Sequence, residues 1–517
     1  MRIPLLCLSV LFACLGSGVA QSTKPNVIII MADDMGFSDI GSYGGEISTP
    51  NLDALAAKGL RFTQFYNTAR CCPTRAALLT GLYPHQAGVG HMVENKGHPS
   101  YQGFLNDRSL TIAEVLRESG YRTYMSGKWH VGENRPHWPV DRGFDRSYAL
   151  VSGGTNYFRL DPNRKLARDD QQIQPPADWY VTDAITNNAA AFVKEHDTAK
   201  PFFLYVAYTA PHWPLHAPPE EIAKYRSKYK DGWDALRELR HKRQIELGLV
   251  DARWPITPRD KGVRPWSDVE NPEEKDLRMA VYAAQITRMD AGIGRVMASL
   301  RERSMDQNTL VLFLADNGGC AEVIERSAKP DAATGVADSF RSYGVGWANA
   351  SNTPFRLYKH WVHEGGISTP LIAHWPAVIK NGGALTQQVG HVIDLMPTAL
   401  DAAGAKYPKE VKGRAITPVE GKSLLSALRG EPPNERTIFW EHEGNRAVRQ
   451  GNWKLVAKHG GGWELYDLAA DRTEMNDLAA PRAEKVKELA ALYDAWATRA
   501  NVVPWGELNA KPKEKAK

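Results

Sequence analysis

The sequence predicts an α/β protein in which helices cover both faces of a large, mostly parallel or mixed sheet. Three apolar runs carry this prediction: Val27–Met31, Phe202–Tyr208 and Thr309–Ala315. Each run is continuous, as expected of a strand that is buried on both of its faces. Segments of helical period separate these runs along the chain. Such an alternation is typical of a mostly parallel sheet covered by helices.

Two segments between the runs have the 3.6-residue period of helices. Ser109–Ser119 places its apolar residues on one side, and Asp276–Arg303 does so over a much greater length. The stretch 215–275 is long, charged and punctuated by proline, so we expect an insertion there, with a helix around Trp233–Leu247.

The character of the sequence changes near residue 430. Short strand-like pieces separated by Gly and Asn follow, and then a helical segment, Ala483–Arg499. We therefore predict a main domain over 24–430, a smaller α+β subdomain with an antiparallel sheet over 431–505, and a disordered basic tail over 506–517. The predicted strands of the subdomain are Thr437–Glu441, Arg446–Arg449 and Lys454–Ala457.

Residues 1–20 have the pattern of a secretory signal peptide. One positive charge precedes an apolar run, and small residues end at Ala20, where we expect cleavage. The apolar run is too short to span a membrane. The segment that ends at Cys14 weakly resembles a bacterial lipoprotein box, and lipid anchoring there is an alternative that we disfavour. We expect an exported protein, in a bacterial periplasm or secreted.

The composition excludes several classes of protein. The chain has 517 residues, of which 43% are hydrophobic and 24% charged, and this balance is ordinary for a globular protein rather than a disordered or collagen-like one. A net charge of +5 on this length gives no reason to expect a nucleic-acid partner. No transmembrane segment is expected, because no later apolar run reaches a spanning length. Five cysteines are too few for a disulfide scaffold, which leaves the adjacent Cys71 and Cys72 to be explained.

Acidic and amide side chains follow two of the predicted strands. Val27–Met31 leads into Asp33 and Asp34, and Thr309–Ala315 leads into Asp316 and Asn317. Ligands of open parallel sheets bind beyond the carboxyl ends of the strands. Hard oxygen ligands of this kind suit Ca²⁺ or Mg²⁺, whereas Zn²⁺ prefers His or Cys. For each pair alone, helix capping is the simpler explanation; for both pairs together, we favour a metal site.

A helix is predicted to begin near the adjacent cysteines. Pro73 suits the first turn of a helix and Gly81 suits its end. Cys71 would then lie at a helix N-terminus, where free N–H groups favour an anion. Arg75 lies one turn further on and can reach back to that anion. The alternative is a buried structural cysteine before a helix.

Basic residues follow other predicted strands. Lys128 and His130 come after a short predicted strand, Tyr121–Met125, and His212 comes after Phe202–Tyr208. Lys359 lies five residues before Glu364-Gly365-Gly366. Single histidines are more often structural than catalytic. A cation, an anion-binding helix start, two histidines and two lysines on one rim nevertheless indicate a site for a tetrahedral oxyanion ester.

With these motifs in this order, the sequence resembles the sulfatases, and specifically the arylsulfatase-type branch of the alkaline phosphatase superfamily. The resemblance covers roughly Lys24 to Trp505. Each motif is weak alone, and the ordered set is highly specific. The motifs are Pro25–Asp34, Cys71–Gly81, Gly127-Lys128-Trp129-His130, Gly143-Phe144-Asp145, Ala315–Gly319, Lys359 with Glu364-Gly365-Gly366, and Trp463–Leu468.

The resemblance implies an alkaline phosphatase-like fold and a modified cysteine. In the family, the first cysteine of Cys-X-Pro-X-Arg, here Cys71, is oxidised by a maturation enzyme to Cα-formylglycine. Cys72 is then only the variable position. One hydroxyl of the hydrated aldehyde attacks sulfur and expels the alcohol, and the second releases the sulfate. An ordinary Ser or Cys lacks that second hydroxyl.

The resemblance also implies a role for each matched residue. Asp33, Asp34, Asp316 and Asn317, with residue 71 itself, would bind Ca²⁺ or Mg²⁺. The other roles are as follows: Arg75 and Lys128 would stabilise the charged diol, His130 would orient it and accept its proton, and His212 and Lys359 would bind the sulfate, with His212 donating a proton to the leaving oxygen. We expect a sulfuric ester hydrolase that acts on a small-molecule or glycan sulfate ester.

Two alternatives to a sulfatase remain at this point. A phosphonate or phosphate diester hydrolase can share both the fold and formylglycine. An inactive carbohydrate-binding relative would keep the fold, but the intact Cys71, Arg75 and Asp pairs argue against it. The loops 94–108, 134–180 and 215–270 are expected to shape specificity.

Overall fold

The structure is a computed structural model that describes residues 22–509. The predicted signal peptide, with Cys14, lies outside the described residues, and so does the end of the predicted tail from residue 510 onward. Within 22–509, no helix is long and apolar enough to cross a membrane.

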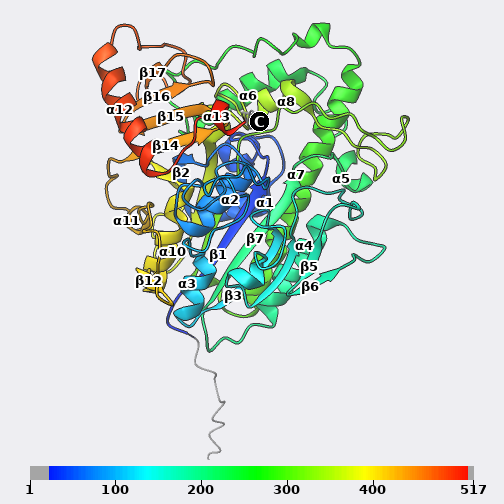
Figure 1. Ribbon diagram of the computed structural model, residues 1–517. Coiled ribbons are helices and arrows are strands. Elements are labelled where there is room, and N and C mark those ends of the chain that lie inside the picture. Colours follow the sequence, from blue (N-terminus) through cyan, green and yellow to red (C-terminus); the bar gives the residue numbers. More distant parts are fainter. Residues whose placement is uncertain (1–21, 510–517) are drawn as a thin grey trace, which may run out of the picture.

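The predicted α/β class is confirmed by a large mixed sheet (Figure 1). Its strand order is β10-β2-β9-β8-β1-β7-β3-β4-β5-β6, with β11 beside β2. β8, β1, β7, β3 and β4 are parallel, while β9 and β5 run antiparallel to their neighbours. The strands are β1 Asn26–Asp33, β2 Leu60–Tyr66, β3 Arg122–Lys128, β4 Arg146–Leu150, β5 Leu166–Arg168, β6 Gln171–Ile173, β7 Phe202–Pro211, β8 Thr309–Ala315, β9 Ser368–His374, β10 Ala384–Thr386 and β11 Gly390–His391.

Helices cover both faces of this sheet, as predicted. Alternate residues of β1 explain the two layers: Ile28 and Ile30 pack in a core with α4 and α7, whereas Val27, Ile29 and Met31 pack in a core with α2, α3 and α10 (Figure 1). The helices are α1 Pro50–Lys58, α2 Cys71–Thr80, α3 Ile112–Glu118, α4 Val181–Lys194, α5 Pro219–Ala223, α6 Gly232–Glu246, α7 Pro272–Glu302, α8 Gly344–Ser351, α9 Glu364–Ile367, α10 Leu395–Ala403, α11 Leu425–Leu428, α12 Ala483–Arg499 and α13 Trp505–Leu508.

The predicted element boundaries needed local corrections. The helix expected over 109–119 begins only at Ile112, because Thr111 and Glu114 form a capping box. The long helix begins earlier than expected, at Pro272, because Asn271 caps it. The strand expected over 121–125 continues to Lys128, so this lysine lies at the end of the strand and not beyond it.

The small C-terminal sheet was also predicted correctly, although β17 was missed. It is antiparallel, in the order β14-β15-β16-β17, and α12 packs on it (Figure 1). Its strands are β14 Thr437–His442, β15 Asn445–Gln450, β16 Trp453–Ala457 and β17 Glu464–Asp467, and a separate two-stranded ribbon pairs β12 Glu410–Val411 with β13 Arg414–Ala415. Val448 and Leu455 belong to the same apolar core as α2 and α3, so the core is continuous across the predicted boundary at 430/431. That boundary stays a prediction.

The start of the predicted disordered tail is instead helical. Trp505 begins the short helix α13, which extends through Leu508. The physical reason is an aromatic contact, because the Trp505 ring packs on His91 with 4.9 Å between ring centroids.

Candidate active site

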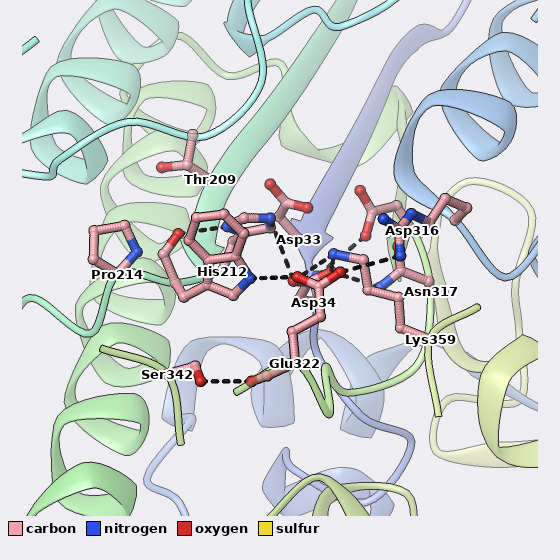
Figure 2. Close-up of polar contacts among 12 residues, drawn as sticks. Asp33, Asp34, Thr209, His212, Pro214, Asp316, Asn317, Glu322, Ser342 and Lys359 are labelled. Atoms are coloured by element: carbon pink, nitrogen blue, oxygen red, sulfur yellow. Dashed lines mark hydrogen bonds and ion pairs between the residues drawn. The ribbon is translucent and has the colours of Figure 1, made fainter. Parts of the chain in front are cut away.

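Two loops rich in carboxylates meet at one edge of the large sheet, where the parallel neighbours β1 and β8 end. The Asp34 backbone N–H donates to Asp316 Oδ1 at 3.1 Å, and Asn317 Nδ2 donates to Asp34 Oδ1 at 2.7 Å. These residues and Asp33 are buried. The structure thus brings four of the five predicted metal ligands together, as Figure 2 shows.

The oxygen atoms of this cluster fit a hard cation. Asp33 Oδ1 and Asn317 Oδ1 are buried and accept no hydrogen bond from the described residues, although the Arg75 guanidinium lies 3.7 Å from Asp33 Oδ1. Orphaned oxygens of this kind are costly in a protein interior unless a partner satisfies them. Carboxylate and amide oxygens are the ligands that Ca²⁺ takes, and this donor set does not favour Zn²⁺.

Three buried cations balance the carboxylates. The pairs are Asp33–Lys128 at 2.7 Å, Asp316–Arg75 at 2.7 Å and Asp34–Lys359 at 2.8 Å. We predicted that Arg75 and Lys128 face the nucleophile and that Lys359 faces the sulfate. In the structure, each of the three cations pairs with a carboxylate of the cluster, and Figure 2 shows this for Lys359 and Asp34.

These pairings separate the pKa values of two neighbouring carboxyls. Burial alone would raise the pKa of Asp33, but the charges of Lys128, His212 and Arg75 lower it below its ordinary value. Burial, together with the negative charge of Asp33, raises the pKa of Asp316. A bound cation would oppose both the burial and the mutual repulsion that raise the pKa of Asp316.

Cys71 begins helix α2, as predicted, and the helix is buried along its whole length. Arg70 has extended backbone before it, and Gly81 ends the helix in the left-handed conformation with φ 68°. A hydrogen bond with Cys72, opposed by burial and assisted by the charge of Lys128, lowers the pKa of the Cys71 thiol well below its ordinary value. Residue 71 therefore lies in an anion-stabilising position.

Of the two predicted histidines, His130 lies beside this helix start and His212 lies beside the carboxylate cluster. His130 follows β3 in the left-handed conformation with φ 59°. Burial and the neighbouring Lys128 lower the pKa of His130 to about 4, so its ring is neutral near pH 7 and can accept a proton. His212 follows β7, and its Nε2 lies 3.5 Å from Asp34 Oδ2 (Figure 2). Its Nδ1 is 2.5 Å from the Trp213 carbonyl oxygen, which orients the ring.

A pair of glycines that sequence reasoning missed covers both histidines. A Cβ atom on Gly153 would lie 2.8 Å from His130 Nε2, and one on Gly154 would lie 3.2 Å from His212 Nδ1. The backbone of this pair therefore packs directly against the two imidazoles. Two adjacent glycines at the end of a strand were the available signal, because glycine often marks a close backbone approach.

Glu322 was also missed. Its carboxylate accepts a hydrogen bond from Trp213 Nε1 at 2.8 Å and pairs with Arg70 at 3.3 Å. Burial opposes ionisation, but the charges of Lys359, Arg70 and His212 lower the pKa of Glu322 to about 2. Glu322 thus anchors the residues next to His212 and Cys71. The nearby Cys320 is buried, and burial raises the pKa of its thiol, which agrees with a structural role.

Comparison with known proteins identifies the family. The family model described as sulfatase matches residues 25–405 of the chain. The chain belongs to the sulfatase family. A second model, described as N-sulphoglucosamine sulphohydrolase, C-terminal, matches residues 355–494. The sulfatase is therefore a sulfuric ester hydrolase, as the motifs predicted.

Several relatives are similar over most of this sulfatase. An arylsulfatase of Klebsiella aerogenes is 36% identical over 79% of this chain and 93% of its own length. Arylsulfatase A of Homo sapiens is 30% identical over 86% of this chain and 77% of its own length. Among solved structures, Ps i-CgsB in complex with k-i-k-neocarrahexaose superposes with a TM-score of 0.68 at 26% identity, covering 92% of this chain and 93% of that chain.

Proposed function

We propose that this sulfatase hydrolyses sulfate monoesters to an alcohol and inorganic sulfate with a formylglycine nucleophile made from Cys71 and with bound Ca²⁺. The observation that carries the proposal is the position of Cys71. It lies at the buried N-terminus of α2, where Lys128 and His130 act on its side chain, beside a carboxylate cluster with two orphaned oxygens.

The chemistry needs two hydroxyls on one carbon, and the hydrated aldehyde at position 71 would supply them. Lys128 and Arg75 stabilise negative charge at this carbon. His130, neutral near pH 7, accepts a proton from the second hydroxyl when sulfate is released. His212 donates a proton to the oxygen of the departing alcohol, and Lys359 binds the sulfate.

Asp33, Asp34, Asp316 and Asn317, together with residue 71, would hold Ca²⁺. When bound, the ion supplies positive charge to a sulfate oxygen and to the nucleophile. Mg²⁺ would take the same oxygen ligands, but it demands a stricter octahedral geometry. Chelation should lower activity and thermal stability together. Asn317→Ala should reduce the thermal stabilisation by added Ca²⁺, whereas the exposed Asn95→Ala should not.

The favoured substrate is a carbohydrate sulfate rather than a simple aryl sulfate. The structure of Ps i-CgsB holds a neocarrahexaose, and that protein matches this chain over nearly its full length. We also propose export to a bacterial periplasm or beyond the cell, on the strength of the signal-like residues 1–20 alone.

The decisive experiment reads the modification and the reaction in one preparation. Peptide mass analysis should find residue 71 about 18 Da lighter than cysteine, since CHO replaces CH₂–SH. The same sample should turn over a sulfate monoester faster than a phosphonate monoester, and Cys71→Ala should fold but lose this turnover. Faster phosphonate hydrolysis would favour the phosphonate or phosphate diester hydrolase. Full activity of Cys71→Ala would exclude a nucleophile made from Cys71.

A further inference from the structure

A second cluster of metal-ligating side chains lies outside the carboxylate site. It consists of His91, His360, His442 and Glu443, which we call the histidine cluster. His91 Nε2 lies 2.8 Å from Glu443 Oε1, and His360 Nδ1 lies 3.0 Å from Glu443 Oε2. His442 Nε2 lies 3.5 Å from Glu443 Oε1. Three imidazoles thus surround one carboxylate.

The cluster joins three distant parts of the chain. His91 comes from the loop after α2, His360 directly follows the site residue Lys359, and His442 ends strand β14 of the small sheet. The ligand atoms that His360, His442 and Glu443 offer all lie within 4.8 Å of one another. A single small cation could therefore contact all three.

Glu443 occupies a backbone position that glutamate does not favour. His442 pairs with Asn445 across the β14–β15 hairpin, so Glu443 and Gly444 form its two-residue turn. Both have positive φ, 52° and 80°, as a type I′ turn requires. Asn, Asp and Gly are the usual residues there. The local turn does not explain the glutamate, but its imidazole partners do.

His442 gives a second, independent indication of a ligand. Its ring is completely buried, and neither ring nitrogen has a hydrogen-bond partner among the described residues. Leaving the nitrogens of a buried ring without a partner is costly in a protein interior, and a bound cation would remove that cost.

We propose that the histidine cluster is a second metal site, which binds a transition cation of the Zn²⁺ class through His360, His442 and Glu443. Imidazole nitrogens with one carboxylate suit Zn²⁺ or Co²⁺, unlike the oxygen ligands of the first site. His91 adjoins the ligand carboxylate, and Trp505 packs on its ring, which fixes it in place. The site does not depend on the proposed sulfatase chemistry.

The cation would link strand β14 of the small sheet to the segment that carries Lys359 of the active site. His360 is adjacent in sequence to Lys359, and its backbone N–H donates to the Ala69 carbonyl at 2.8 Å, two residues before Cys71. Asn445 Nδ2 contacts the other ring nitrogen of His360 at 3.2 Å, so this imidazole is held on both sides. Metal binding should therefore stabilise the hairpin and the segment that carries Lys359.

The test uses the full chain with Cys71→Ala, which removes the thiol as a competing ligand. Metal-free protein is given excess Ca²⁺ to fill the oxygen site and is then titrated with Co²⁺. We expect one equivalent of Co²⁺ with the strong visible absorption of a tetrahedral site, displaced by Zn²⁺. His442→Ala and Glu443→Gln should each weaken binding by at least about 100-fold.

The control is His98→Ala, which removes a histidine of the same loop as His91 but outside the cluster, and it should bind Co²⁺ normally. Glu443→Gln is nearly isosteric and keeps the test valid if His442→Ala fails to fold. Co²⁺ binding that both variants leave unchanged, or no tetrahedral spectrum at all, would overturn the proposal. Retained sulfatase activity in Cys71→Ala together with a normal Co²⁺ spectrum would contradict the proposed function and leave this site standing.

Discussion

Lys128 Nζ lies 2.7 Å from Asp33 Oδ2, and both side chains are completely buried. Removing one partner of a buried ion pair leaves an uncompensated charge and costs about 3–5 kcal/mol. We expect Lys128→Met to destabilise the protein by an amount in this range and to abolish turnover. Because Ca²⁺ would supply positive charge to the same carboxylate, the loss should be smaller when Ca²⁺ is present.

The measurement is denaturant unfolding with and without Ca²⁺. Lys487→Met is a matched control, because Lys487 and its partner Glu484 are exposed, and such surface pairs contribute at most about 1 kcal/mol. An equal destabilisation of Lys128→Met at all Ca²⁺ concentrations would show that Asp33 is not a ligand.

Gly153 allows a prediction about activity with little effect on the fold. Its backbone lies so close to His130 that an added Cβ would be 2.8 Å from the ring nitrogen Nε2. Gly153→Ala should displace this imidazole and lower kcat by at least about 10-fold, since small misplacements of catalytic groups are costly. Gly462→Ala, where an added Cβ meets nothing within 4 Å, should have normal kcat. Normal kcat in Gly153→Ala would mean that the close packing of the Gly153 backbone does not position His130 for catalysis.

The parts of the site that follow strands could be predicted from sequence, whereas the contacts between them could not. Asp33 and Asp316 were found because each follows a continuous apolar run, and parallel strands end at one edge. Glu322 has no such local mark, and the adjacent glycines at 153 and 154 indicate only a close backbone approach and not the group that is approached. Their roles depend on Trp213 and His130, which are distant in sequence, so only the folded chain brings the partners together.

The boundary of the small sheet was hard to judge for a related reason. Composition changes near residue 430, and strands do follow. The packing, however, depends on residues from both sides: Tyr66 of β2 lies in one apolar cluster with Ile438 and Trp440 of β14. Sequence patterns report the period of each strand and not the surface against which it packs.

The protonation of the buried His216 ring should make the free energy of unfolding depend on pH. Its Nδ1 accepts from the Tyr157 N–H at 3.3 Å and its Nε2 donates to the Ser339 carbonyl at 2.7 Å, so only the neutral ring satisfies both contacts. Burial lowers the pKa of His216 to about 4 from 6.5. The unfolded chain therefore binds a proton first, and stability is lost as the pH falls from 6.5 towards 4.

This shift corresponds to about 3 kcal/mol of unfolding free energy. Urea unfolding of His216→Gln across this pH range should show a shallower loss of stability than the parent protein, along with lower stability at pH 7. His98→Gln, which changes a partly exposed histidine, should keep the parental slope. Identical slopes for His216→Gln and the parent would rule out this titration.

A substitution at Lys454 can test whether the small sheet unfolds separately from the large one. Its Nζ lies 2.9 Å from Glu364 Oε1 and 2.8 Å from Glu474 Oε1, and all three side chains are buried. Lys454 is in β16, whereas Glu364 begins α9 next to the large sheet. Because the network and the apolar core both cross the predicted boundary, we expect one cooperative unfolding transition.

Lys454→Met should lower the free energy of unfolding by about 3–5 kcal/mol, since two carboxylates lose their shared partner. Calorimetry checks both claims: a second transition, or an early transition in Lys454→Met that leaves the main one in place, would show that residues 431–505 unfold as a separate unit.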